Sequence, residues 1–219
     1  RLLLDDFKGK RMAVVFFLDK DIDDYLRTRK RSSHVIYTEY HSVENYVFKH
    51  SDLAEATAAV ASLDIDSIRT GLGDQRKWLR KAAFNWKDWV TLCVAARSLR
   101  VPCRMNYSVQ SQINNGVCGT VNKRLKTQFK SELQRASGMA SLAFKSRFDR
   151  AAKHVDVLYD QDLQDRIFKG EWYTAFLAED IKSIAGARSY NANALGQGVI
   201  PAASLTLDFT QPWAVHLRD

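Results

Sequence analysis

The sequence predicts an α/β fold in which a parallel sheet comes first and a large helical region follows it. Residues 12–18 (MAVVFFL) are apolar on both alternating faces, as in a strand of a parallel sheet that helices cover on both sides. From Asp74 onward, apolar residues recur at spacings of three and four instead, which is typical of amphipathic helices. No obvious linker separates the two regions. We therefore divide the chain into an α/β part, residues 1–66, and a basic helical extension, residues 67–219.

The α/β part is expected to contain a second strand and two further helices. His34–Thr38 is a shorter candidate strand, and the basic stretch Arg27–Arg31 before it leaves room for only a short helix or a loop. Helices are expected over Glu44–Phe48 and Asp52–Leu63. The second of these is rich in alanine, which has a high helix propensity, and Ser51 is its expected N-cap.

The extension is expected to be helical throughout. One amphipathic helix of several turns would carry Trp78 through Cys93 and end at Pro102. The later expected elements are a turn at 114–116, helices over 121–133 and 142–155, a helix that begins near Glu171, a loop over 191–198 and a final helix after Pro201.

The net charge of +8 is unevenly distributed along the chain. Residues 1–66 carry −2, residues 67–153 carry +14 and residues 154–219 carry −4. A basic block of this size favours a polyanion such as DNA or RNA, although solvated helix faces are the alternative. Trp78 lies within this block, and we expect it in the helical core rather than stacked on a base. The residues predicted to contact phosphates are Arg76, Lys77, Arg80, Lys81, Lys123 and Arg124.

The composition favours the cytoplasm over a membrane or secretion. No apolar run approaches the roughly 20 residues of a membrane span, and no apolar stretch of a signal peptide follows a basic start. Cys93, Cys103 and Cys118 are odd in number and lack the spacing of a zinc site or a disulfide framework. We expect three buried thiols in a reducing compartment.

Three acidic residues follow the predicted strands. Asp19 and Asp21 come directly after the first strand, and side chains two apart on an extended chain point to the same face. Glu44 lies just past the second strand, and open α/β sheets bind ligands outside the carboxyl ends of their strands. Close carboxylates repel one another unless a cation neutralises them, and oxygen ligands suit Mg²⁺ or Mn²⁺. We predict that these three residues form a catalytic metal site; the alternative is a set of helix-capping acids in a polar loop.

Other interpretations of the same region remain open. His41 could contact a phosphate or a metal-bound water, but a surface or capped histidine is the expected state. Phosphatases with an aspartyl nucleophile also carry Asp-x-Asp after a strand, but their next residues differ from Ile22 and Asp23. Sugar-nucleotide transferases use Asp-x-Asp as well, and they do not require a basic helical region.

Two segments carry a resemblance to a known family. VVFFLDKDIDDY (14–25) and VIYTEYHSVENYVF (35–48) resemble the second half of a TOPRIM domain, and FKGEWY (168–173) resembles a recurring late segment of the same family. The family is related to the OLD nucleases and includes effectors that accompany ABC-type ATPases in anti-phage defence, as in PARIS systems.

The resemblance implies a Mg²⁺-dependent endonuclease that cleaves DNA or RNA, acting as a toxin-like defence effector with an ABC-type ATPase partner. Asp19 and Asp21 match the metal-binding pair, and Glu44 matches the acid of a Ser-x-Glu-Asn-Tyr segment. A homodimer is left open. The fold implied is a TOPRIM-like parallel sheet followed by the helical extension.

The resemblance also implies a glutamate on an earlier strand that serves as general acid or base. No Val-Glu-Gly-type strand precedes Arg1 in the sequence. We therefore expect this glutamate upstream, and we expect the chain alone to be an inactive or nearly inactive nuclease. The alternative function is a non-catalytic subunit with vestigial carboxylates that docks on a partner protein or a nucleic acid.

Overall fold

The computed structural model describes residues 16–30, 32, 34–101, 121, 123–186 and 191–215. Most of these residues are helical, and two short strands, β1 (Phe16–Leu18) and β2 (Val35–Tyr37), form a parallel sheet with Phe16 opposite Val35. The predicted combination of a parallel sheet with many helices is therefore confirmed. Residues 12–15 of the first predicted strand lie outside the described residues.

A short helix connects the two strands. α2 (Asp23–Leu26) ends at Arg27, whose backbone takes the left-handed conformation with φ of 56°. The Arg27 N–H donates to the carbonyls of Asp23 and Asp24, which closes the helix. The expected short helix or loop before β2 is therefore present as a single turn, and both strands then run in the same direction.

Three helices follow β2, and acidic side chains cap two of them. α3 (Val43–His50) begins with a capping box between Ser42 and Asn45. α4 (Leu53–Ala61) is capped by Asp52, which accepts a hydrogen bond of 2.9 Å from the Glu55 N–H. The prediction of Ser51 as this N-cap is wrong, because the Ser51 hydroxyl donates to the Val47 carbonyl at the end of α3 instead. α5 (Ile65–Leu72) is capped in the same way as α4, by Asp64.

The long helix expected around Trp78–Cys93 is two helices. α6 (Gln75–Asn85) and α7 (Lys87–Leu99) meet at Trp86, whose φ of −106° and ψ of 14° interrupt the helix. Residues three apart share one face of a continuous helix, but here Trp86 and Trp89 face different partners. Trp86 packs against Trp172 and Phe176, whereas Trp89 packs against Phe129 of the following helix. The break allows both indole rings to be buried.

Two helices come next, as predicted. α8 (Lys123–Ser137) and α9 (Ser141–Asp160) are joined at Gly138, whose φ of 64° suits glycine. Phe129 and Leu133 of α8 and Phe144 and Phe148 of α9 are buried. The expected helix end at Pro102, the turn at 114–116 and the other two cysteines lie outside the described residues, while Cys93 is buried as expected.

The last part of the chain departs from the prediction after residue 190. The helix expected near Glu171 is present as η3 (Gly170–Trp172) and α10 (Tyr173–Ala185), but α11 (Ala192–Ser204) replaces the expected loop and runs through Pro201. A Cβ atom on Gly196 would lie 2.7 Å from Thr174 Cγ2, and one on Gly198 would lie 2.6 Å from Val60 Cγ1. The small residues therefore serve close helix packing, which outweighs the cost of Pro201 inside the helix, about 3 kcal/mol. The remaining short helices are η2 (Gln164–Arg166) and η4 (Pro212–Ala214).

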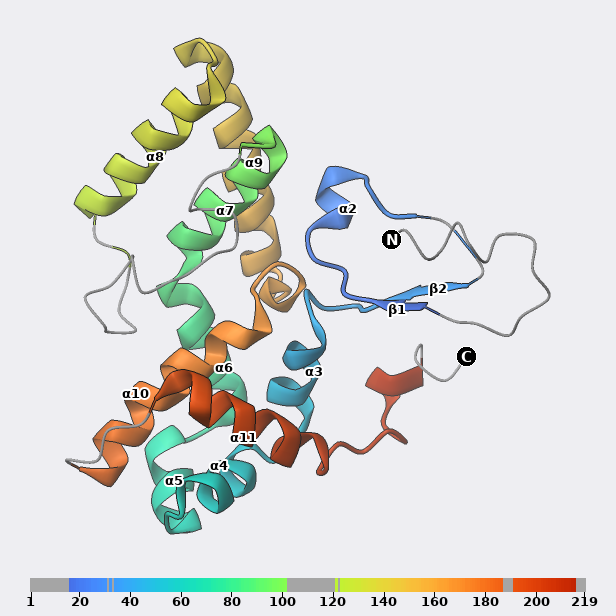
Figure 1. Ribbon diagram of the computed structural model, residues 1–219, viewed down its shortest axis with the longest axis vertical. Coiled ribbons are helices and arrows are strands. Elements are labelled where there is room, and N and C mark those ends of the chain that lie inside the picture. Colours follow the sequence, from blue (N-terminus) through green and yellow to red (C-terminus); the bar gives the residue numbers. More distant parts are fainter. Residues whose placement is uncertain are drawn as a thin grey trace.

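One hydrophobic core includes residues from both predicted parts of the chain. Val47 and Leu53 lie in the same cluster as Trp86, Leu177 and Val199. Figure 1 shows the sheet and α2 beside the helical body, with α3 leading from β2 into it. Among the described helices, none combines the length and apolar character of a membrane span.

Candidate functional site

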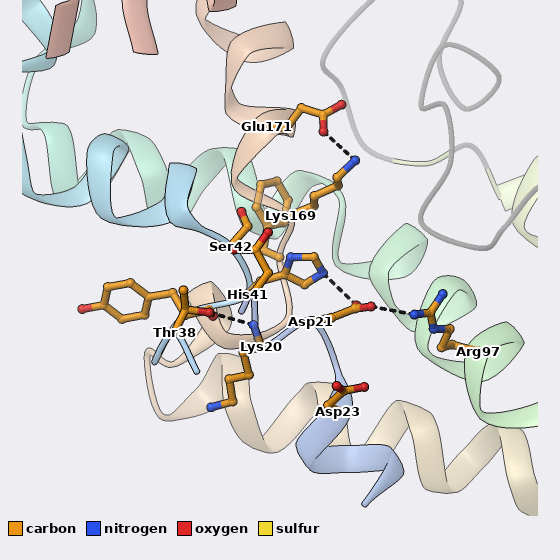
Figure 2. A network of polar contacts seen from close by, with 12 residues as sticks. Lys20, Asp21, Asp23, Thr38, His41, Ser42, Arg97, Lys169 and Glu171 are labelled. Atoms are coloured by element: carbon orange, nitrogen blue, oxygen red, sulfur yellow. Dashed lines mark hydrogen bonds and ion pairs between the residues drawn. The ribbon is translucent and has the colours of Figure 1, made fainter. Parts of the chain in front are cut away.

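The candidate site lies at the carboxyl ends of the two parallel strands. The Thr38 N–H, directly after β2, donates to the Leu18 carbonyl at 3.0 Å. The Thr38 hydroxyl then accepts a hydrogen bond of 2.7 Å from the Lys20 N–H and donates one of 2.7 Å to the Tyr40 carbonyl. These bonds hold the loop after β1 against the loop after β2, as Figure 2 shows for Lys20 and Thr38. Both loops therefore reach the edge of the sheet at which open α/β sheets bind ligands.

Asp19 lies beside the first turn of α3. Its Oδ1 atom accepts a hydrogen bond of 3.2 Å from the Val43 N–H. Partial burial and then the negative charge of Glu44 raise the pKa of Asp19, against the lowering effects of the Val43 hydrogen bond and of His41. Two of the predicted carboxylates, 25 positions apart in the sequence, are thus close enough to repel each other.

Asp21 is held by two basic side chains. Figure 2 shows its carboxylate between His41 and Arg97, with His41 Nε2 at 3.3 Å from Oδ1 and an Arg97 guanidinium nitrogen at 2.7 Å from Oδ2. Burial alone would raise the pKa of Asp21, but the hydrogen bond and charge of His41 and the charge of Arg97 lower it below its ordinary value. Asp21 is therefore an ionised and oriented carboxylate.

The backbone at Asp21 is not extended. Its φ of 51° lies in the left-handed region, and its N–H donates to the His41 carbonyl at 2.9 Å. Alternation along an extended chain therefore does not relate Asp19 to Asp21. The two carboxylates still interact, because the charge of Asp21 contributes to the raised pKa of Asp19.

His41 belongs to the site, and the expectation of a surface histidine is wrong. Only 6% of His41 is exposed, and its backbone N–H donates to the Asp165 backbone carbonyl at 2.8 Å. The buried Asp165 carboxylate in turn accepts hydrogen bonds from Lys49 at 2.7 Å and from the Tyr173 hydroxyl at 3.0 Å. A late segment of the chain therefore fixes the loop that carries His41.

The same late segment packs against the start of α3. Asn45 Nδ2 donates to the Phe168 carbonyl at 3.0 Å. A Cβ atom on Gly170 would lie 2.5 Å from the Asn45 backbone nitrogen, so only glycine fits at this position without a shift of the neighbouring backbone. Residues 168–170 thus help to position the helix turn that carries Glu44.

The predicted phosphate-contacting residues lie on two helices. Arg76, Lys77, Arg80 and Lys81 are exposed on α6, and Lys123 and Arg124 are exposed on α8. Figure 1 shows α8 beside α7, and α7 follows directly after α6 in the chain. Trp78 is buried, and its indole N–H donates to Asp180 at 2.6 Å, so its expected place in the core is confirmed.

Arg97 is the site residue that sequence reasoning missed. It lies 76 positions after Asp21, in the last turn of α7, and no local motif marks it. His41 had a local indication, because it directly precedes the capping box of α3 and lies three positions before Glu44. Its burial depends on Asp165, which is 124 positions further along the chain.

The donor atoms at the sheet edge suit a hard divalent cation. Asp19 and Glu44 offer carboxylate oxygens, and a cation between them would relieve the repulsion that raises the pKa of Asp19. Among the described residues, no group of three or more His, Cys, Asp or Glu side chains is arranged to hold a metal ion. Mg²⁺ is commonly bound by one or two carboxylates together with waters and substrate phosphates.

Comparison with known proteins identifies no relative. No protein-family model, curated protein or solved structure matches the chain. The functional assignment therefore depends on the residues of the site and on their geometry.

Proposed function

We propose that the protein is a Mg²⁺-dependent nuclease that cleaves phosphodiester bonds in DNA or RNA, with a TOPRIM-like catalytic region. The observation that carries the proposal is the position of Asp19 at the carboxyl edge of a parallel sheet, where its Oδ1 atom accepts a hydrogen bond from the Val43 N–H in the helix turn that carries Glu44. Burial first, and the negative charge of Glu44 second, raise the pKa of Asp19. Asp21 follows in the same loop. The resemblance of residues 14–25 and 35–48 to TOPRIM nucleases supports the same assignment.

The residues of the site have separate roles in this proposal. Asp19 and Glu44 would hold the cation, with Mn²⁺ as a substitute. When bound, Mg²⁺ would supply an activated water or stabilise the leaving oxygen. Asp21 keeps His41 and Arg97 in place through the two contacts at its carboxylate. Arg97 then presents a guanidinium group, which suits a phosphate, beside these carboxylates.

The proposal includes a biological setting that rests on the family resemblance. The chain would act in the cytoplasm as an anti-phage effector controlled by an ABC-type ATPase partner. The six basic residues on α6 and α8 would contribute charge that attracts the nucleic acid, because they are exposed.

A specific observation favours one alternative, a non-catalytic binding subunit. Both oxygens of Asp21 are already engaged, one by His41 and one by Arg97. A carboxylate in that state is a structural ion pair unless Arg97 is displaced. On this alternative the protein binds nucleic acid or an acidic partner but does not cleave.

Glu44→Gln tests the proposal against the alternative. We expect this variant to weaken Mn²⁺ binding by about tenfold or more, because a neutral amide replaces a carboxylate ligand. Calorimetric titration with Mn²⁺ measures the affinity, and incubation of a labelled oligonucleotide with Mg²⁺ or EDTA measures cleavage.

Glu55→Gln is the matched control, since Glu55 also lies in the first turn of a helix but away from the sheet edge. It should leave Mn²⁺ affinity unchanged. Tight binding of an oligonucleotide without any Mn²⁺ binding would reject the nuclease and support the binding subunit.

A further inference from the structure

A cleft of about 900 Å³ lies between α2, the carboxyl-terminal end of α7 and α9. Two aspartates, Asp23 and Asp24, contribute to its wall, against five arginines, so these residues give the wall a net charge of +3. None of the arginines belongs to the basic set on α6 and α8. They are Arg27, Arg97, Arg100, Arg147 and Arg150.

The two aspartates of the wall already have hydrogen-bond or ion-pair partners. Asp23 is 2% exposed and accepts a hydrogen bond of 2.7 Å from the Thr28 hydroxyl. Asp24 forms an ion pair of 2.8 Å with Lys20 and a second one with Arg29. In the described part of the chain, the four arginines other than Arg97 form no ion pair with an acid. Four of the five arginines therefore bring guanidinium charge to the cleft without an acidic partner among the described residues.

Arg97 connects this cleft to the carboxylate site. Its guanidinium group lines the cleft and lies 2.7 Å from Asp21 Oδ2. Figure 2 shows Arg97 directed from α7 toward Asp21, on the side away from Thr38. A phosphate held by Arg97 would therefore be next to the edge of the sheet where Asp19 and Glu44 interact.

An aromatic pair forms another part of the wall. The rings of Tyr25 and His154 are stacked, with centroids 4.5 Å apart, and both residues line the cleft. Flat rings beside guanidinium groups suit a chain of nucleotides, because arginines contact the phosphates while rings contact bases or sugars. The two rings would add no comparable stacking contacts to the binding of an acidic peptide.

We propose that this arginine cleft binds the phosphate backbone of a nucleic-acid strand and directs it to the carboxylates at the sheet edge. The direction toward the carboxylates rests on the proposed nuclease function, whereas the binding itself does not. Planar guanidinium groups match phosphate oxygens in pairs, and the five arginines come from three different helices or helix ends, so they can follow several phosphates. A free nucleotide shares the phosphate chemistry and is distinguished by experiment.

The test removes two arginines of α9 together, as Arg147→Gln/Arg150→Gln. Binding of fluorescent 20-nucleotide single strands, one of RNA and one of DNA, is followed by anisotropy in EDTA at several salt concentrations. We expect affinity at low salt to fall about tenfold or more, and the slope of log affinity against log salt to decrease by about 1.4, since each phosphate contact on a single strand contributes about 0.7.

Lys145→Gln/Lys153→Gln is the control, because both lysines are exposed on the same helix and do not line the cleft. The control should keep the wild-type slope of log affinity against log salt. Both double variants should melt within about 2 °C of the wild type, as expected for exposed positions. Equal losses in the two double variants would overturn the proposal.

A competition experiment separates a strand from a free nucleotide. Pyrophosphate and ADP should displace the labelled strand only at concentrations far above that of an unlabelled strand. If either one binds through Arg147 and Arg150 as tightly as the strand, the cleft is a nucleotide pocket and the proposal is wrong. Strand binding in EDTA without any Mn²⁺ binding at the sheet edge would reject the nuclease function while leaving the arginine cleft established.

Discussion

In a form of the protein that includes the expected upstream glutamate, Asp19→Asn is expected to abolish metal-dependent cleavage, and in the chain itself it should stabilise the metal-free protein. The substitution removes one of the two carboxylates that interact at the sheet edge. We expect a loss of activity on the order of 10²-fold or more, the size typical of groups that act at the reacting atoms. Mn²⁺ affinity should fall together with activity.

The stabilisation follows from the direction of the pKa shift. The pKa of Asp19 is raised in the folded protein, by burial first and by Glu44 second. Ionisation is therefore harder in the folded than in the unfolded state, so the charged carboxylate lowers stability at neutral pH. This destabilisation disappears as the pH falls through the raised pKa, where the folded protein holds the proton. A neutral asparagine should remove it, and the melting temperature in EDTA should rise at pH 7 but not at pH 3.

The control for Asp19→Asn is Asp66→Asn, an exposed acid in the first turn of α5. It should leave cleavage, Mn²⁺ affinity and the pH dependence of melting unchanged. If Asp19→Asn itself leaves Mn²⁺ affinity and cleavage at the wild-type level, then Asp19 is not a metal ligand. The proposed magnesium site would have to be abandoned.

Trp86→Ala is expected to cost the largest amount of folding stability, about 3–5 kcal/mol. Trp86 is 2% exposed, and its ring packs against Phe168, Trp172 and Phe176 with centroids 6.4, 5.7 and 4.6 Å away. Alanine would leave a large cavity at the junction of α6 and α7. For a chain of this length the melting temperature should fall by roughly 10 °C.

Denaturant unfolding monitored by circular dichroism measures this loss, and Leu142→Ala is its control. Leu142 is 84% exposed on α9, so its truncation should change stability by less than about 0.5 kcal/mol. A loss below about 1 kcal/mol for Trp86→Ala would mean that the junction of α6 and α7 is not packed as described.

The local pattern of residues was enough to predict much of the fold. The run of apolar residues at 12–18, followed by acids, predicted a parallel strand, and β1 is part of a parallel sheet. The expectation that both faces of this strand are covered is wrong, because Phe17 is 46% exposed. Periodicity predicted α8 and α9 because each buries one stripe of side chains. Local patterns gave wrong predictions at two places: one expected helix is two helices, and one helix continues through an expected loop. The break at Trp86 serves ring packing between helices, and α11 continues through Pro201 because Gly196 and Gly198 fit against α10 and α4.

The positions of Asp19 and Glu44 could likewise be predicted from sequence alone, because both depend on short-range features, the end of a strand and the start of a capped helix. Only the tertiary structure showed that Arg97 engages Asp21, that Asp165 holds His41 inside the protein, and that arginines of α7 and α9 line one cleft with α2. These contacts join residues far apart in the chain. Arginines are equally compatible with any exposed helix face, so their convergence depends on how α7 and α9 pack together, which no local pattern of residues encodes.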